Sequence, residues 1–153
     1  NHGGAHAVQL FDTWAGLLSV DDYRAIALPA TQRAVEVFRE RAERRVPLIH
    51  YAKGSAHLHG LIRTLDIDAV SLDWRDDLRA NRTAHGDRFA FQGNLDPSRM
   101  HGSPEAATAA AQRVLDEAGD APGHVFNLGH GFAPGAKIDC VEAVLRLITG
   151  DSS

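Results

Sequence analysis

The chain has 153 residues, of which 44% are hydrophobic, and this predicts a single domain, 1–153, with enough apolar side chains to build a core. Its formal net charge is −4 and its basic residues form no long run, which argues against nucleic acid as a partner. No apolar run approaches the ~20 residues that a membrane span needs. The single cysteine, Cys140, excludes an internal disulfide and a thiolate cage for a metal, and together these features predict a soluble, cytoplasmic protein.

Short apolar runs that end in polar residues recur five times along the chain, and we expect each to be a strand. They lie at 7–11, 47–49, 69–72, 89–91 and 124–128. Because the runs are short and largely apolar, they fit parallel strands that are covered on both faces.

Segments with helical periodicity lie between these strands. The first begins at an N-cap, Ser19, and runs to about Arg45, and Pro29 inside it is expected to kink it or split it in two. Ser103 and Pro104 predict the clearest helix start. The remaining helical segments are predicted at 56–65, at 76–84 (a polar helix or a loop) and at 138–148.

A strand followed by a helix, repeated with reactive side chains at the carboxyl ends of the strands, is typical of a TIM-barrel enzyme of the α/β class. Eight such units typically need ~250 residues, so the five units here predict an incomplete barrel. The chain opens on Asn1–Gly4 without an initiator methionine, a signal peptide or a preceding helix. We therefore expect it to be part of a larger protein or to close its sheet with another chain.

Four motifs at the strand ends are distinctive: QLFDTWAG at 9–16, VSLDWR at 70–75, QGNLDP at 92–97 and GHVFNLGHG at 123–131. In kind and in order they resemble segments of the uroporphyrinogen decarboxylase family. The resemblance implies a (β/α)8 barrel enzyme of haem biosynthesis, usually a homodimer, that needs no metal or organic cofactor. That family removes CO2 from the four acetate side chains of uroporphyrinogen III to give coproporphyrinogen III.

On this resemblance the chain corresponds to strands four to eight of the family's barrel. The family's aspartate that holds the pyrrole N–H groups, its arginine pair and its active-site tyrosine lie upstream, and none has a counterpart here. The resemblance implies roles for three residues that are present. His130 would bind a substrate carboxylate or help to move protons, Thr13 would contact substrate through its hydroxyl, and Phe11 would form an apolar wall against the macrocycle.

Each of these three roles has a plainer alternative. Thr13 can be a buried residue that satisfies a strand-end carbonyl, His130 a satisfied polar group, and Phe11 ordinary barrel packing. Other strand-end residues are expected to be structural or solvated rather than in contact with substrate. The structural group is Asp73, Trp74, Gln92 and Asn94, and the cations that can meet carboxylates or stay solvated are Lys53 and Arg75.

Two other functions compete with the enzyme. In the first, the chain is a non-catalytic half-barrel whose two open sheet edges and apolar interior pair with the missing half or with a second copy. In the second, it is a relative of the corrinoid methyltransferases, and His50, His57 and His59 bind zinc. The zinc interpretation is disfavoured because the segment His50-Tyr51-Ala52 lacks the thiolate of the His-x-Cys pair in those relatives.

Overall fold

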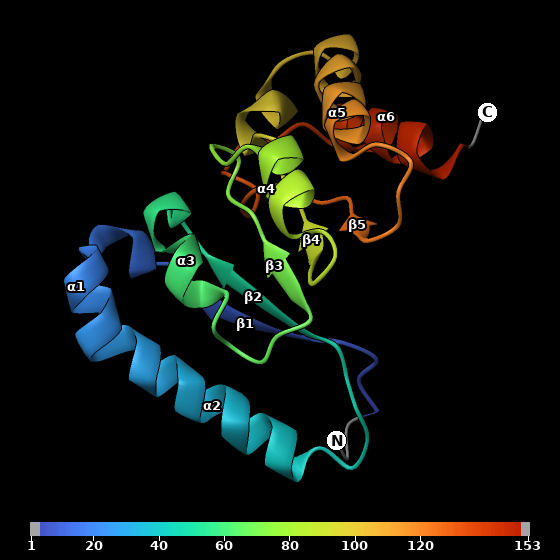
Figure 1. Cartoon of the computed structure of the whole chain (residues 1–153). Helices are drawn as coiled ribbons and strands as arrows, with labels where there is room; N and C mark the ends of the chain where they lie inside the picture. The colour runs from blue at the N-terminus through green and yellow to red at the C-terminus, as the bar shows by residue number, and fades with distance from the viewer. Residues whose placement is uncertain (1–3, 151–153) are drawn as a thin grey trace.

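Five parallel strands form one sheet in the computed structural model of the chain, which describes residues 4–150 (Figure 1). The strands follow one another across the sheet in chain order, and every neighbouring pair is parallel. The strands are β1 Val8–Asp12, β2 Leu48–Ala52, β3 Ala69–Ser71, β4 Ala90–Gln92 and β5 His124–Val125. The opening residues 1–3 and the tail 151–153 lie outside the described residues.

Helical segments follow the strands, so the predicted alternation of strand and helix is confirmed. The helical elements are η1 Ala15–Leu17, α1 Val20–Asp22, η2 Tyr23–Ala27, α2 Leu28–Arg41, η3 Ala56–Leu58, α3 His59–Ile62, α4 Leu78–His85, η4 Pro97–His101, α5 Pro104–Ala118 and α6 Ile138–Thr149. In Figure 1, α2 runs along the side of the molecule near β1 and β2, whereas α5 and α6 pack together near β4 and β5. None of these helices is long and apolar enough to cross a membrane.

The first helical segment begins where the sequence predicts but is irregular. The Ser19 hydroxyl accepts a hydrogen bond from the Asp22 N–H at 3.1 Å and so caps α1. A π-helical turn, η2, joins α1 to α2 without a break in the helical run, and Pro29 follows it in the first turn of α2. The expected irregularity is therefore a π-helical turn within one run, and the helix ends at Arg41 rather than near Arg45.

The strand predicted at 124–128 is shorter than expected. β5 ends at Val125, because its neighbour β4 ends at Gln92 and the chain then turns at Gly93, whose φ is +122°. Beyond the turn the two segments meet again in a single bridge between Leu95 and Leu128. This bridge fixes the path of the loop that follows β5.

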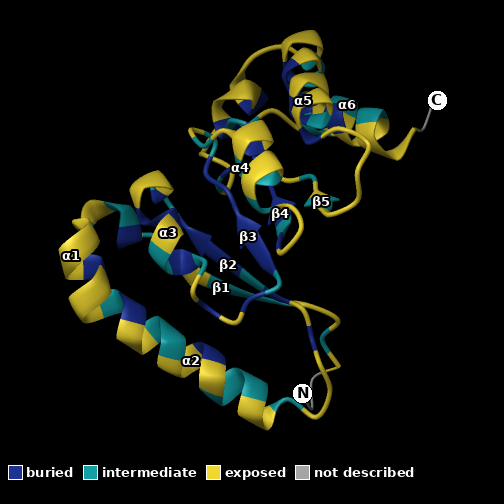
Figure 2. Ribbon diagram, in the orientation of Figure 1, coloured by how far each residue is buried: buried dark blue, intermediate teal, exposed yellow. Residues whose placement is uncertain are grey.

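The outer face of the sheet carries the hydrophobic core. Leu48, Val70 and Phe91 alternate along their strands and are buried beneath the helices. Figure 2 shows this as the dark blue of β2 and β3 and as helices that are yellow on their outer surfaces. The core therefore lies between the sheet and the helical layer, as in one wall of a TIM barrel.

The inner face of the sheet is more polar than the sequence predicts. Phe11, Tyr51, Ser71 and Gln92 lie side by side in register across β1 to β4. The Gln92 amide donates to the Ser71 hydroxyl and to the Gln9 side-chain carbonyl, both at 3.1 Å. The expected apolar interior is thus wrong in part, because hydrogen-bonded polar side chains alternate with the outward-facing apolar ones.

Candidate active site

A cavity of about 240 Å³ opens on the inner face, at the carboxyl ends of the strands. It brings together Phe11 from β1, Tyr51 from β2 and His130 from the loop after β5. Its full lining is Gln9, Phe11, Tyr51, Ser71, Asn127, Leu128, His130, Gly131 and Phe132. Two of the three residues to which the sequence analysis assigns substrate contact, Phe11 and His130, therefore share one cavity.

His130 is held among aromatic rings. The Tyr51 ring stacks with the imidazole at a centroid distance of 5.9 Å and an interplanar angle of 12°. The Trp74 ring stacks with it at 6.3 Å and 25°. The Tyr51 hydroxyl also lies 3.1 Å from Nδ1 of His130. These contacts fix the orientation of the imidazole plane and give its Nδ1 a polar neighbour.

Gly129 allows the His130 loop to lie against the loop after β3. A Cβ built on Gly129 would lie 2.3 Å from the backbone nitrogen of Trp74, which is closer than any side chain can approach. The Gly129 carbonyl accepts a hydrogen bond from the Tyr51 hydroxyl at 2.9 Å. Glycine at this position therefore lets Trp74 and Tyr51 reach His130 together.

The loop that carries Trp74 is braced by the carboxylate of Asp73, which is completely buried. It accepts hydrogen bonds from the Gly54 N–H at 3.0 Å and from the Arg75 guanidinium, through Nε and Nη2, both at 2.8 Å. Burial alone would raise the pKa of Asp73, but the hydrogen bonds from Arg75 and from the backbone hold it below its usual range. Asp73 is therefore structural, as predicted.

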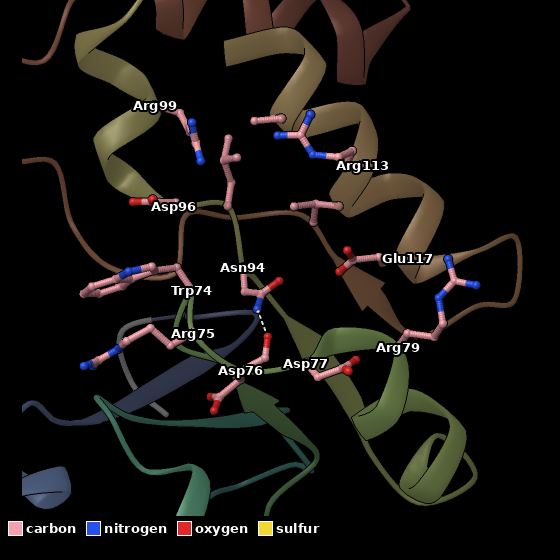
Figure 3. Close-up of a pocket in the computed structure, with 13 residues that line it drawn as sticks. Trp74, Arg75, Asp76, Asp77, Arg79, Asn94, Asp96, Arg99, Arg113 and Glu117 are labelled. Carbon is pink, nitrogen blue, oxygen red and sulfur yellow. Dashed lines mark hydrogen bonds between the residues drawn. The ribbon is translucent and has the colours of Figure 1, made fainter. Parts of the chain in front are cut away.

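Asn94 joins this loop to β4. Its side-chain amide donates to the carbonyls of Asp73 and Asp76, at 3.0 and 2.8 Å, and the second bond is drawn in Figure 3. The structural roles predicted for Asn94 and Gln92 agree with these contacts, whereas Trp74 contacts His130 directly.

A larger cavity of about 490 Å³ lies on the other side of the Trp74 loop, between that loop, η4 and α5 (Figure 3). Its lining includes four arginines and four carboxylates, so its formal charges balance; these are Arg75, Arg79, Arg99, Arg113, Asp76, Asp77, Asp96 and Glu117. We place the candidate active site in the smaller cavity, because only that cavity holds His130 and opens toward the barrel interior.

Asp76 is nearly buried beside His59, with 3.6 Å between its Oδ2 and the His59 Nε2. Burial raises the pKa of Asp76 to about 6, and burial lowers the pKa of His59 to about 4. Asp76 Oδ2 also accepts the backbone N–H of Asp73. This pair therefore stabilises the Trp74 loop from the side away from the small cavity.

The other predicted site residues lie outside the small cavity. Thr13 directly follows β1 and is half-buried, but it does not line the cavity. The Arg75 guanidinium is paired with Asp73 and lies 4.7 Å from the Trp74 ring, while Lys53 Nζ is 5.8 Å from that ring. His50 is buried and His57 is exposed, and residues 4–150 hold no group of three or more potential metal ligands.

Tyr51 is the site residue that the motifs do not indicate. The signal that could have revealed it is the alternation along β2, which places Tyr51 on the inner face next to Phe11. Its hydroxyl contact to the loop after β5 spans 79 residues of sequence, and only the folded sheet reveals it.

An open parallel sheet whose strands follow chain order, with helices on its outer face, is the architecture of part of a TIM barrel. A solved methyltransferase from Methanosarcina mazei has the same fold, with a TM-score of 0.78 over 97% of this chain and 43% of that one. At 17% identity this likeness shows the fold alone. The sequence matches the family described as Uroporphyrinogen decarboxylase (URO-D) over residues 1–150, and the chain belongs to this family.

Curated relatives give the same result. A uroporphyrinogen decarboxylase from Azoarcus sp. (strain BH72) is 48% identical over 131 residues, which cover 85% of this chain and 37% of that protein. Its counterpart from Coxiella burnetii (strain RSA 493 / Nine Mile phase I) is 42% identical over 146 residues, covering 95% of this chain and 40% of that protein. The chain thus spans about two fifths of the length of these relatives.

Proposed function

We propose that this chain forms the carboxyl-terminal part of a uroporphyrinogen decarboxylase, a carboxy-lyase that converts uroporphyrinogen III to coproporphyrinogen III by removing four molecules of CO2. The observation that carries the proposal is the family match over residues 1–150. The cavity that joins Phe11 to His130 supports it, because both residues lie at the carboxyl ends of strands, where TIM-barrel enzymes bind their substrates. The proposed location is the cytoplasm.

In this proposal His130 is the principal contact to the porphyrinogen. A protonated imidazole donates a charge-assisted hydrogen bond to a substrate carboxylate and can also transfer a proton. Phe11, of which 64% is exposed on the inner face, supplies an apolar surface for the macrocycle. Thr13 is a further proposed contact through its hydroxyl, at the end of the same strand.

The proposed chemistry uses no cofactor, because the pyrrole ring of the substrate itself accepts the electrons. Protonation of a pyrrole carbon beside an acetate arm gives a cation, into which the electron pair of the breaking C–C bond moves as CO2 leaves. The exocyclic methylene carbon that remains then takes up a proton to become a methyl group, and the ring carbon loses the proton that it gained, so each decarboxylation consumes one proton overall. The protein's share is to hold the macrocycle and to stabilise that cation. His130, Phe11 and Thr13 would supply the part of this binding that lies in the present chain.

The test is turnover under anaerobic conditions. The purified chain is incubated with uroporphyrinogen III, alone and together with the amino-terminal segment of a relative, and coproporphyrinogen and its partly decarboxylated intermediates are measured. We expect His130→Ala to lower the rate by about 100-fold. His101→Ala, which changes an exposed histidine outside the cavity, should leave the rate unchanged. Full activity of His130→Ala would refute the role of His130.

A second candidate function, pairing with another barrel segment, is favoured by the two sheet edges. β1 and β5 each have one neighbouring strand within residues 4–150, and Val125 on β5 is 47% exposed. Unpaired edge strands are templates for added strands. The proposed partner is a complementing barrel half or a second copy of this chain. Activity that requires the added amino-terminal segment would support a complementing half.

A further inference from the structure

The Tyr51 hydroxyl makes two polar contacts, and it has one proton to share between them. It lies 2.9 Å from the Gly129 carbonyl oxygen and 3.1 Å from Nδ1 of His130. A carbonyl oxygen can only accept a hydrogen bond, so the phenol proton must point to Gly129. The phenol oxygen then presents its lone pairs to His130, and the second contact is a hydrogen bond only when Nδ1 carries a proton.

We propose that Tyr51 is a positioning residue that holds neutral His130 as the Nδ1–H tautomer and leaves its Nε2 without a proton. The tautomer of a histidine is set by the hydrogen bond that its other nitrogen makes. This inference deepens the proposed function, and its consequence for substrate rests on that function.

Tyr51 is well placed for this role because the sheet and the neighbouring rings immobilise it. It is 3% exposed, and its ring meets Phe11 edge-on at 5.8 Å and stacks with His130. Burial is the main factor that raises the pKa of Tyr51, so the phenol keeps its proton at physiological pH. Because the neutral hydroxyl donates its proton to the Gly129 carbonyl, its oxygen is a fixed hydrogen-bond acceptor for His130.

The charged groups around this pair come from the loops after β2 and β3. Asp73, Arg75 and Asp76 act on Tyr51 from the loop after β3, and Lys53 faces Trp74 from the loop after β2. Asp73 and Arg75 neutralise each other in an ion pair with an N–O distance of 2.8 Å. The hydroxyl of Tyr51 is therefore the group in direct contact with Nδ1 that decides which nitrogen is protonated.

The tautomer changes what His130 can offer a carboxylate. Neutral His130 with a bare Nε2 presents a lone pair and repels a carboxylate oxygen, whereas the imidazolium donates from Nε2. Binding of a carboxylate at Nε2 should therefore require protonated His130 and weaken as the pH rises. Without the Tyr51 hydroxyl, neutral His130 is free to place its proton on Nε2 and still donate.

The first experiment reads the tautomer directly. The imidazole nitrogens of His130 are assigned by ¹⁵N NMR at a pH where the ring is neutral, in the unmodified chain, in Tyr51→Phe and in Tyr23→Phe. We expect Nδ1–H in the unmodified chain and in Tyr23→Phe, and a shift toward Nε2–H in Tyr51→Phe. Tyr23 is the matched control, because it is the other of the chain's two tyrosines and does not line the cavity.

An Nε2–H tautomer in the unmodified chain overturns the proposal, even if Tyr51→Phe fails to fold. An Nδ1–H tautomer that persists in a folded Tyr51→Phe variant overturns it as well. Unchanged resonances of the other histidines establish that the variant is folded.

The second experiment measures binding of uroporphyrin I, a stable oxidised porphyrin with the same carboxylate arms, by fluorescence between pH 5.5 and 8.5. We expect the affinity of the unmodified chain to fall with pH, and the affinity of Tyr51→Phe to fall less steeply. Absence of porphyrin binding in every variant, also after the amino-terminal segment of a relative is added, would, together with the expected tautomers, refute the proposed function and leave the role of Tyr51 intact. Parallel pH profiles would overturn the proposed consequence for binding.

Discussion

His50 is a buried histidine that the site does not use. It lies on the outer face of β2, is completely buried, and neither ring nitrogen has a hydrogen-bond partner among the described residues. Burial lowers its pKa from 6.5 to about 4, and Asp12 offsets this only in part. The folded chain therefore keeps His50 neutral, while the unfolded chain protonates it below pH 6.5.

We expect His50 to weaken the fold in acid. Its contribution is fully present above pH 6.5 and is lost as the pH falls toward 4, at a cost of about 3 kcal/mol in the free energy of unfolding. His50→Ile, which fills the position with a strand-forming apolar side chain, should remove this loss. Urea unfolding of both proteins at pH 7.5 and pH 5 measures it. Equal acid sensitivity of the two proteins would contradict the expectation.

Gly129 gives a second prediction for a single residue. Gly129→Ala forces a Cβ into the backbone of Trp74, so we expect a loss of about 2–3 kcal/mol in the free energy of unfolding and a displaced His130. Gly131→Ala is the matched control, since a Cβ there meets no atom within 4 Å, and it should change stability by less than about 0.5 kcal/mol. Urea unfolding and the His130 NMR resonances are the measurements, and equal losses in the two variants would contradict the argument.

At the scale of residues, the structure brings together in one cavity two residues that the sequence motifs single out, and their contact with substrate stays a prediction. His130 and Phe11 share the cavity, and Asp73, Gln92 and Asn94 have the structural contacts expected of them. The sequence motifs did not identify Tyr51, because its partner His130 lies 79 residues further along the chain. No local sequence pattern indicates a contact over that separation.

Arg39 connects three elements through one side chain. From α2 it donates to the carbonyls of Val46 and Asp66, both at 2.8 Å, and to the carboxylate of Asp68 at 2.7 Å. Its side chain is 13% exposed, so the charge-assisted bonds to Val46 and Asp68 are partly shielded from water, whereas the bond to Asp66 lies at the surface. Arg39 thereby fastens the end of α2 to the segments that enter β2 and β3.

Replacing Arg39 by methionine should lower the free energy of unfolding by about 2 kcal/mol, because two carbonyls lose their hydrogen bonds from its guanidinium and the Asp68 carboxylate keeps only its bonds from Arg45 and the Leu48 N–H. Arg33→Met on the same helix is the control. Its guanidinium is 65% exposed and pairs with Glu36 at 3.3 Å, so we expect a change below about 1 kcal/mol. Thermal and urea unfolding compare the two, and similar losses would show that Arg39 has no special role.

Element starts were easier to predict from sequence than strand ends. Ser19 and Ser103 cap their helices as expected, because capping depends on side chains three residues apart. The end of β5 depends on the turn at Gly93 in a neighbouring strand, which the run 124–128 does not encode. The order of the strands, in contrast, follows directly from repeated strand–helix units.

For the whole molecule, the open sheet predicts association. We expect sedimentation of the purified chain to depend on its concentration, because β1 and β5 leave edges that another strand can pair with. Val125→Lys places a charge on β5 and should weaken association, whereas Ile26→Lys on η2, a more exposed apolar residue away from the sheet, should not. A monomer at every concentration would contradict the pairing proposal.

The order of the strands in the sheet also affects how the chain can fold during its synthesis. In the sheet, each strand pairs with the strands just before and after it in the chain. Each described strand after β1 can therefore pair with the strand made just before it as soon as it has itself been made. His130 lies in the loop after β5, so it reaches the cavity only after the strands that supply Phe11 and Tyr51 have been made.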